Sequence, residues 1–332
     1  MNKKTISLLS GGLDSILATK LILDQGIEVV GLHFTSNFAS KSDKERGLQA
    51  VKTADELGIR LIVKDKGPEY LEIIKKPRYG YGKNVNPCID CRIFMLQKTE
   101  TVMVEEGAGF LVTGEVVGQR PMSQKRHTIE LIEKRSGLNG LIVRPLSAKL
   151  FPPTRPEQEG VIDREKLLAL SGRSRETQYN LVAFYNMKQF ARPGGGCLLT
   201  DPIFGCKLKD FMSKDPEFTL KDIEFLTMGR YFRLDNNTTL FLGRNQEENE
   251  RLESLWAAPY VLLSPCDFKG PKGILRGAFT EENVKIAAHI MAFYSKYTAS
   301  IIRIEANNGL PKIYEVKQEE IDIETFKIKE TK

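Results

Sequence analysis

Apolar positions in the first part of the chain follow two alternating patterns. Short runs of apolar, often β-branched residues predict buried strands at residues 6–9, 26–34 and 60–63. Apolar residues at helical spacing predict helices between these strands, at residues 16–23 and 42–57. Because strand and helix alternate, the pattern predicts an α/β fold with a doubly wound parallel sheet.

The same alternation continues along the next part of the chain. Further helices and strands are predicted at residues 69–74, 92–106, 110–115 and 141–145. The stretch 163–190 is also helical in its pattern, with an interruption near Ser171-Gly172. Ligands of doubly wound sheets bind at the carboxyl ends of the strands, so the loops that follow the strands are the first places to search for a site.

The pattern changes after about residue 205. Strand-like runs then alternate with turns, at residues 238–243, 260–263 and 301–304. One amphipathic helix is predicted at residues 281–297. We therefore predict two domains: a doubly wound domain of residues 1–205, and a second, smaller α+β domain of residues 206–332.

The first predicted strand leads directly into Ser10-Gly11-Gly12-Leu13-Asp14-Ser15, and a helix follows. A strand, a glycine-rich turn and a helix N-terminus together point backbone N–H groups and partial positive charge at one place. The glycines allow close approach of an anion, and the serines add hydroxyl donors. We predict a phosphate cradle here. It is not a Walker A loop, because no lysine follows the glycines; an ordinary capped turn is the alternative.

Other residues are candidates for contacts with the nucleotide. Asp14 has no cationic neighbour within its own loop, so its carboxylate could hold Mg²⁺ against the phosphates. Phe34 lies at the carboxyl end of the second strand, which makes it a candidate for the adenosine pocket. Packing at the strand end explains Phe34 equally well. Lys83, Arg120 and Lys125 are basic residues that could stabilise phosphate charge.

Cysteines supply a second candidate chemistry. The pair Cys88-x-x-Cys91 fits a redox pair, half of a zinc site, or part of an iron–sulfur cluster. The remaining cysteines, Cys197, Cys206 and Cys266, contain no second C-x-x-C, which disfavours a zinc site. Cys197 follows a glycine run that can pass close to another element, although a small buried residue is the alternative. Thiolates from Cys88, Cys91 and Cys197 would leave one iron of a [4Fe–4S] cluster open.

A basic loop precedes the cysteine pair. It contains Lys76, Arg78 and Lys83 with two tyrosines between them, Tyr79 and Tyr81. Basic residues interleaved with aromatic ones suit contact with an RNA backbone and stacking on its bases. A solvated loop without a function is the alternative.

Composition narrows the class of protein. The 332 residues are 41% hydrophobic and 28% charged, which is ordinary for a soluble globular protein. The net charge of +6 allows a polyanionic partner without demonstrating one. The sequence has no apolar span of 18 residues and no signal peptide, so we expect no membrane association. Five cysteines without an export signal favour reduced thiols in a cytoplasmic protein.

The phosphate loop resembles the S-G-G-x-D-S signature of the PP-loop ATP pyrophosphatases. With Asn86-Pro87-Cys88-x-x-Cys91, the chain is similar to the tRNA 2-thiouridylases. The runs Thr113-Gly114-Glu115-x-x-Gly118-Gln119 and Arg144-Pro145-Leu146 resemble the catalytic domain of tRNA 4-thiouridine synthetases. In that family the first run is a turn that contacts the nucleotide, which implies ATP contacts at Thr113, Gly114 and Gln119.

The resemblance covers about residues 1–205 and implies ATP-dependent thiolation of tRNA. A uridine carbonyl would be adenylated, and sulfur would then displace AMP. The implied partners are tRNA and a sulfur donor, either sulfide or a cysteine desulfurase, and a homodimer is left open. The THUMP and rhodanese-like segments of the synthetases have no counterpart in this sequence, so we expect tRNA docking and sulfur delivery to differ or to come from partners.

Three alternatives stay open at this point. Sulfur could be carried as a persulfide by a cysteine pair, without a cluster. The chain could be a PP-loop ligase or amidase that adenylates a small carboxylate, although the cysteines would then lack a joint role. It could also be a non-catalytic RNA-binding protein that retains an ATP site.

Residues 206–332 resemble an NFACT-R domain. The resemblance rests on Gly229-Arg230-Tyr231-Phe232 and on the run from Leu242 to Asn249. It implies contact with RNA. Arg230, Arg244 and Arg276 lie in glycine-flanked turns, where we expect basic side chains to reach phosphates.

Overall fold

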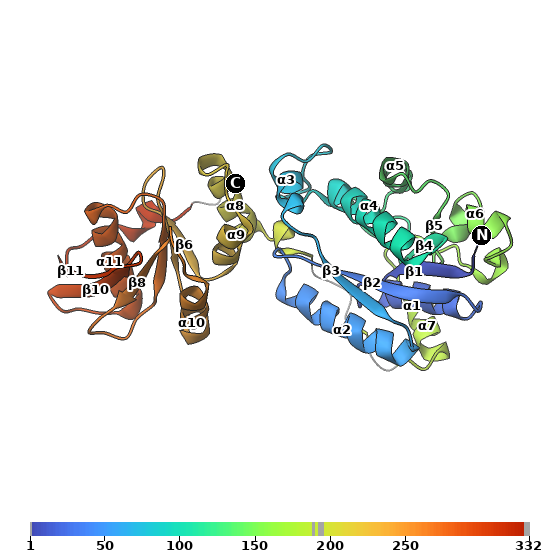
Figure 1. Cartoon of the computed structure of the whole chain (residues 1–332), viewed down its shortest axis with the longest axis horizontal. Coiled ribbons are helices and arrows are strands. Elements are labelled where there is room, and N and C mark those ends of the chain that lie inside the picture. Colours follow the sequence, from blue (N-terminus) through green and yellow to red (C-terminus); the bar gives the residue numbers. More distant parts are fainter. Residues whose placement is uncertain (1, 188–189, 192–195, 329–332) are drawn as a thin grey trace. The chain divides into compact units, whose positions relative to one another are not determined.

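The computed structural model describes residues 2–187, 190–191 and 196–328. The chain divides into two compact units, Met1–Thr200 and Asp201–Lys332, which are described separately (Figure 1). The division expected at residue 205 would fall inside helix α8 (Pro202–Lys214), which begins where the Asp201 carboxylate accepts the Phe204 N–H at 2.8 Å. No helix in the described ranges is both long enough and apolar enough to cross a bilayer.

The first unit is built on a five-stranded parallel sheet with the order β3-β2-β1-β4-β5. The strands are β1 (Lys4–Leu8), β2 (Glu28–Thr35), β3 (Leu61–Asp65), β4 (Phe110–Thr113) and β5 (Ile142–Val143). The strand order reverses direction at β1, where β2 lies on one side and β4 on the other. The carboxyl ends of β1 and β4 therefore border the crevice in which such sheets bind ligands.

Helices cover both faces of this sheet (Figure 1). One face carries α1 (Leu13–Leu23), α2 (Lys41–Leu57) and α7 (Glu176–Phe184), and the other carries α4 (Cys88–Glu106) and α5 (Arg126–Ser136). Neighbouring strand residues face opposite cores: Val29 packs with α1, and Val30 packs with α4. The predicted doubly wound α/β fold is confirmed.

The elements differ from the prediction in two places. Helix α4 begins at Cys88 rather than Arg92, so both cysteines of the C-x-x-C pair lie in its first turn. The stretch 163–190 contains only the short turn η2 (Arg164–Lys166) and α7 among its described residues. The other short elements of this unit are α3 (Glu69–Lys75), α6 (Arg155–Gln158), η1 (Ala148–Leu150) and η3 (Leu198–Thr200).

The second unit is built on a six-stranded antiparallel sheet with the order β11-β10-β8-β9-β7-β6. Its strands are β6 (Arg230–Arg233), β7 (Thr239–Leu242), β8 (Val261–Pro265), β9 (Gly273–Arg276), β10 (Ile301–Asn307) and β11 (Pro311–Lys317). Its helices are α8, α9 (Leu220–Thr227), α10 (Gln246–Leu255), α11 (Glu281–Ser295) and the short η4 (Ile323–Phe326). The predicted smaller α+β domain is thus present.

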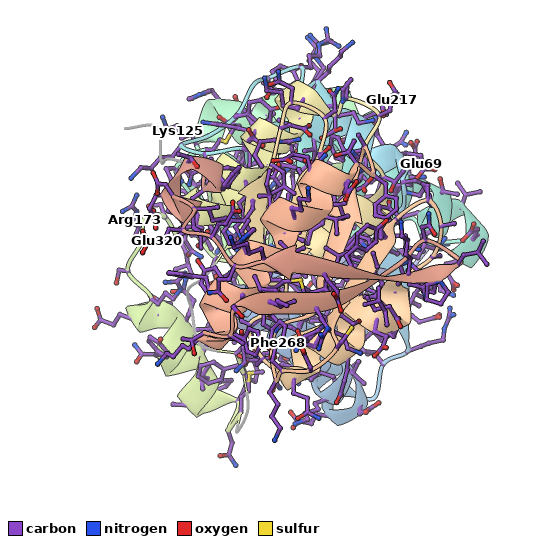
Figure 2. The ribbon with its side chains drawn as sticks, turned by 90° about the vertical axis from the view of Figure 1, so that its left-hand side faces the viewer. Glu69, Lys125, Arg173, Glu217, Phe268 and Glu320 are labelled. Atoms are coloured by element: carbon purple, nitrogen blue, oxygen red, sulfur yellow. The ribbon has the colours of Figure 1, made fainter. Side chains whose placement is uncertain are left out.

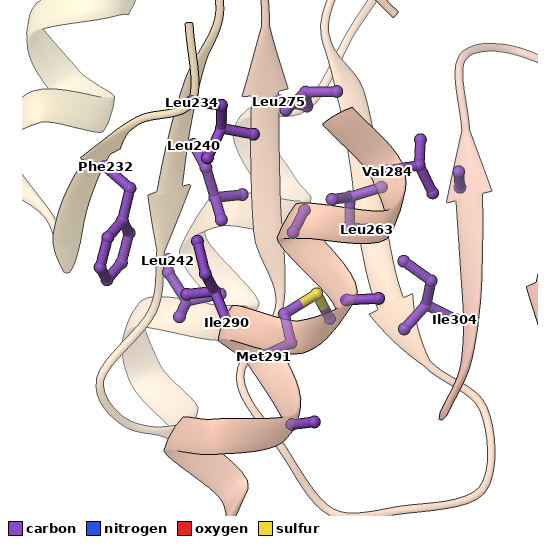
Figure 3. Close-up of a cluster of buried hydrophobic side chains, with 14 of the residues drawn as sticks. Phe232, Leu234, Leu240, Leu242, Leu263, Leu275, Val284, Ile290, Met291 and Ile304 are labelled. Atoms are coloured by element: carbon purple, nitrogen blue, oxygen red, sulfur yellow. The ribbon is translucent and has the colours of Figure 1, made fainter. Parts of the chain in front are cut away.

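Alternate residues of β7 face two apolar layers. Leu240 and Leu242 pack with Ile290 and Met291 of α11 on one face of the sheet (Figure 3). Phe241 lies in a cluster of aromatic rings from α8, α9, β6 and the loops beside them, made up of Phe211, Phe218, Phe225, Tyr231 and Tyr260. Near the end of α11, Phe268 stacks on Tyr297 with ring centroids 4.5 Å apart (Figure 2 labels Phe268).

Candidate active site

The loop between β1 and α1 has the geometry of an anion site. Gly11 has φ +74°, and a Cβ atom there would lie 2.0 Å from the Arg46 carbonyl oxygen, so only glycine fits. Gly12 is the N-cap of α1 and provides no side-chain cap, which leaves N–H groups of the first turn for a ligand. The Ser10 and Ser15 hydroxyls lie 3.1 Å apart beside them.

The turn after β4 packs directly against this loop. A Cβ atom on Gly114 would lie 2.5 Å from the Ser15 nitrogen, so the two backbones touch. Gly114 lines the pocket above the loop, whereas Thr113 is fully buried and its hydroxyl donates to Glu115 at 3.1 Å. The side chain of Thr113 therefore supports the turn. The nucleotide contact that the resemblance implied for Thr113 stays a prediction.

Asp14 is held by side chains from distant parts of the chain. Its carboxylate accepts hydrogen bonds from Gln119 Nε2 at 2.6 Å and from Gln178 Nε2 at 3.2 Å. Arg175 Nε lies 4.0 Å away. The sequence expectation that Asp14 lacks a cationic neighbour holds only within its loop. Arg175 and Gln178 were missed because nothing in the local pattern links them to residue 14.

The three cysteines of interest line the same pocket. Cys88 and Cys91 lie in the first turn of α4, and Cys197 immediately precedes η3. Lys66 Nζ donates to Cys91 Sγ at 3.2 Å, and Asn86 Nδ2 donates to Cys88 Sγ at 3.3 Å.

The other two cysteines lie outside that pocket. Cys206 belongs to α8 of the second unit, and Cys266 is exposed at the end of β8. The structure thus separates the three expected ligands from the remaining two.

Burial controls the acidity of two of these thiols. It raises the pKa of Cys88, and it raises the pKa of Cys197 to about 11. The negative charge of neighbouring thiolates raises both pKa values further. The pKa of the buried Tyr70 hydroxyl is also raised, first by burial and then by Cys91. These thiols keep their protons at neutral pH unless a cation binds them.

The phosphate loop and these three cysteines line one cavity of about 340 Å³. Its lining includes seven of the residues expected from the sequence to bind ATP: Ser10, Gly12, Asp14, Ser15, Phe34, Gly114 and Gln119. Cys88, Cys91 and Cys197 complete the same wall, with Lys66 and Arg120 beside them. A phosphate site and three thiols therefore meet within the space of one bound substrate.

The donor set fits an iron–sulfur cluster better than a single ion. Among the described residues, no three His, Cys, Asp or Glu side chains converge on one ion position. A [4Fe–4S] cluster binds each thiolate through a different iron, so its ligands need not converge on one point. Three thiols that line one pocket are compatible with that arrangement.

A buried ion network fixes the turn between β4 and the pocket. Glu115 accepts hydrogen bonds from Arg92 Nε at 2.8 Å and from Arg144 Nε at 3.1 Å, and Arg144 also binds Glu133. Burial alone would raise the pKa of Glu115, but the two arginines outweigh it and lower that pKa to about 2. Glu115 thus anchors the start of α4 to the end of β4, a role that the sequence motif did not reveal.

The basic loop before α4 is ordered by that helix. Asp90 accepts the Arg78 and Tyr79 N–H groups at 3.0 Å each. Lys76, Arg78 and Lys83 are exposed on this loop, as RNA contact requires. Their role with RNA stays a prediction.

The expected RNA-binding arginines of the second unit all have partners inside the protein. Arg230 lies over the Tyr294 ring at 4.1 Å, and Arg244 pairs with Glu248. Arg276 binds Asp215 at 2.6 Å and Asp222 at 2.7 Å. Arg276 is therefore a half-buried residue that is paired inside the second unit, and its contact with RNA stays a prediction.

Two family models match separate parts of the chain. Residues 1–149 match the model described as thiamine biosynthesis protein (ThiI). Residues 229–327 match the model described as NFACT protein RNA binding domain. The similarity to each family that the sequence led us to expect is confirmed over these residues.

Two curated relatives illustrate the extent of the similarity. A tRNA-specific 2-thiouridylase MnmA from Sulfurimonas denitrificans is 32% identical over 121 residues, covering 35% of this chain and 36% of the relative. A probable tRNA sulfurtransferase from Anoxybacillus flavithermus is 28% identical over 198 residues, covering 50% of this chain and 49% of the relative. The chain spans no more than about half the length of these curated relatives.

Two solved structures also align with the chain. A crystal structure of a 4-thiouridine synthetase–RNA complex with bound ATP is 23% identical, with a TM-score of 0.37, and covers 54% of this chain and 50% of that chain. The U34-tRNA thiolase NcsA from Methanococcus maripaludis with its [4Fe-4S] cluster is 18% identical, with a TM-score of 0.35, and covers 67% of this chain and 70% of that chain.

Proposed function

We propose that this chain is an ATP-dependent tRNA sulfurtransferase that replaces a uridine carbonyl oxygen with sulfur. The proposal rests on one observation: the phosphate loop and three thiols line a single pocket. An enzyme that adenylates a base and then transfers sulfur to it needs both groups within reach of one bound substrate. The ThiI-family match supports the same reaction class. A ligase acting on a small carboxylate would leave the three thiols without a shared role.

The first step is adenylation of the base. The uridine carbonyl oxygen attacks the α-phosphorus of ATP, the bond to the bridging oxygen of the β-phosphate breaks, and pyrophosphate leaves. N–H groups at the start of α1 and the serine hydroxyls of the loop would hold the phosphates. Arg175 is suited to the developing negative charge, because its buried Nε has no hydrogen-bond partner among the described residues.

Asp14 is the carboxylate best suited to hold Mg²⁺ in this pocket. Three carboxylates line the cavity, but Glu115 is bound by two arginines and Asp43 by Arg46. Asp14 accepts its two hydrogen bonds from neutral amides, its ion pair with Arg175 is longer at 4.0 Å, and it retains further acceptor capacity. Magnesium in nucleotide sites is held by one or two carboxylates together with phosphate oxygens and water. When bound there, Mg²⁺ would neutralise charge on the phosphates of ATP.

The second step is transfer of sulfur. Hydrosulfide attacks the adenylated carbon, a C–S bond forms, the C–O bond breaks, and AMP leaves with the oxygen. The hydrosulfide proton passes to N3 of the base and replaces the proton that adenylation released. No electrons are gained or lost in this exchange. Cys88, Cys91 and Cys197 would hold a [4Fe–4S] cluster, which when bound supplies an iron without a protein ligand to which hydrosulfide can bind. Lys66 contributes positive charge beside Cys91, where the anionic sulfur must enter.

A persulfide route is the alternative for this second step. One cysteine would carry the sulfur and another would resolve it, which ends in a disulfide and requires a reductant in every cycle. A cysteine that attacks sulfur needs its thiolate form near neutral pH. Burial raises the pKa of Cys88 and Cys197, which disfavours either of these two thiols as the free attacking nucleophile.

The proposal is tested by reconstitution. Anaerobically purified protein, unthiolated tRNA, ATP, Mg²⁺ and sulfide should yield AMP, pyrophosphate and thiouridine, the last measured by mass spectrometry of the digested tRNA. The position of sulfur on the base follows from the same spectrum. Absence of thiouridine with iron-loaded, folded protein and tRNA from the same source would reject the proposal. Thiouridine formed by iron-free protein would leave the sulfurtransferase in place and select the persulfide route.

A further inference from the structure

A second cavity borders the pocket that holds the cysteines. It is a surface groove of about 670 Å³. Two segments form its walls: residues 82–86, which lead into the C-x-x-C pair, and residues 121–128, which follow Gln119 and Arg120. Thr200 closes it next to Leu199, which lines the cysteine pocket. The segments that build the first pocket thus continue into the second.

Asn86 is the side chain that the two cavities share. Its amide nitrogen donates to Cys88 Sγ at 3.3 Å, and its amide oxygen accepts the Asn84 N–H at 3.2 Å. Gly82 leaves room for this amide, because a Cβ atom there would lie 2.3 Å from Asn86 Nδ2. Asn86 is therefore held at the boundary, with the cysteines on one side and the groove on the other.

The groove is lined by basic side chains, and its two lysines form no ion pair with any described residue. Lys83, Lys125 and His127 line it, and no acidic side chain among the described residues does so. Lys83 and Lys125 are exposed and form no ion pair within the described part of the chain; Figure 2 labels Lys125. Arg120 continues the positive charge toward the cysteines, since it lowers the pKa of Cys88 that burial raises.

The groove also offers apolar surface of the kind that bases contact. Met122 and Pro121 lie on one wall and Ile89 at the start of α4 on another. Unpaired cations along a path, with apolar side chains between them, match the needs of a nucleic-acid strand: phosphates bind the cations, and bases lie on the apolar surface. A small anion such as free phosphate could contact the basic side chains but would leave the apolar side chains of the groove uncovered.

We propose that this groove binds the unpaired RNA strand that flanks the target uridine. The proposal rests on the sulfurtransferase function and names the path of its substrate. Phosphates beside the uridine contact Lys83 and Lys125, and the uridine itself passes Asn86 into the pocket that contains the phosphate loop and the three thiols. A base must leave its stack to reach such a pocket, and a bound flanking strand holds it there.

The test is tRNA binding by the full chain across a range of salt concentrations. Lys83→Ala and Lys125→Ala should each lower the affinity about fivefold at about 0.1 M salt, and each should reduce the slope of log K against log salt by about 0.7. Lys134→Ala is the matched control, since Lys134 is an exposed lysine on α5 without an ion pair in the described chain. Its affinity and salt slope should equal those of the wild type. The thermal unfolding midpoint should be unchanged in all three variants, which shows that each has folded.

The outcomes separate this proposal from the function on which it rests. Unchanged tRNA affinity and salt slope in the Lys83→Ala Lys125→Ala double variant would overturn the proposal that the groove binds RNA, even if the wild type thiolates tRNA. Loss of tRNA affinity in the double variant would support RNA binding in the groove, even if no thiouridine forms. Ultraviolet crosslinking of wild-type protein to tRNA should mark peptides containing residues 82–89 or 121–128. Crosslinks confined to the second unit would contradict the proposal.

Discussion

Two sets of cations in this chain look alike in the sequence and differ in the structure. Lys83 and Lys125 of the first unit lie exposed on loops and have no ion pair in the described chain. Arg276 of the second unit is bound by Asp215 and Asp222, and its side chain is 19% exposed. A phosphate can bind the lysines directly, whereas it must displace two carboxylates to bind the arginine.

The difference lies in pairing and burial, because each unit contains arginines bound by carboxylates. In the first unit Arg92 and Arg144 hold the buried Glu115, much as Arg276 holds Asp222 in the second. Glycine-flanked basic residues therefore do not by themselves identify a nucleic-acid surface. An unpaired cation next to a cavity is the better sign, since its charge is still available to a ligand.

The largest effect is expected from breaking the pairing of Arg276. Arg276→Ala should destabilise the second unit by about 3–5 kcal/mol, because it leaves the buried Asp222 carboxylate without its cationic partner. Hydrogen exchange followed by mass spectrometry should show faster exchange in peptides of residues 201–328. Arg251→Ala, an exposed position on α10, should leave exchange unchanged. Equal exchange in the two variants would show that the pairing of Arg276 does not stabilise the second unit.

A somewhat smaller effect is expected from the paired arginines of the first unit. The pKa of Glu115 is lowered to about 2 in the folded protein, so its ionised form is favoured by folding. This stability, on the order of 3 kcal/mol, is present above about pH 4.5 and is lost as the pH falls toward 2. The free energy of unfolding of the wild type, measured with urea, should therefore decrease as the pH falls over this range.

The matching variant is Glu115→Gln, which keeps the shape of the side chain and removes its charge. It should be less stable than the wild type at pH 7, and the difference should shrink as the pH falls. A constant difference between pH 7 and pH 3 would mean that the charge of Glu115 does not stabilise the fold.

The smallest effect is expected at Arg230 and Arg244. Each already has a partner, the Tyr294 ring for Arg230 and Glu248 for Arg244. Arg230→Ala and Arg244→Ala should therefore change tRNA affinity by less than about twofold, with an unchanged salt slope. A loss as large as that of Lys83→Ala would restore the RNA contact that the sequence suggested for these arginines, and would weaken the distinction between free and paired cations.

The local sequence pattern was sufficient to predict most of the fold. The phosphate loop, the parallel sheet and most helices of the first unit follow from apolar periodicity and glycine positions, which depend on neighbouring residues. The C-x-x-C pair and Cys197 could be grouped because chemistry limits which residues hold an iron–sulfur cluster. The structure then places them in one pocket with the phosphate loop.

Contacts between distant segments could not be predicted. Nothing near Gln178 or Arg175 marks them as neighbours of Asp14, which lies more than 160 residues earlier. The stretch 163–190 is helical in its pattern, yet Leu167, Leu168 and Leu170 pack against the first unit's core from irregular chain. Tertiary packing, not periodicity, decides the conformation of such residues. The pairing of Arg276 was missed for the same reason.

The central claim is that the phosphate loop and the three thiols serve successive steps of one reaction. The most direct test measures AMP and thiouridine together, with tRNA, ATP and sulfide, in three variants. Asp14→Ala should lose both products, since adenylation comes first. Cys197→Ser should still form AMP, because water can attack the adenylated base, but should yield no thiouridine. Cys266→Ser, an exposed cysteine outside the pocket, should form both at wild-type levels. Thiouridine at wild-type levels in folded Cys197→Ser protein would contradict the account.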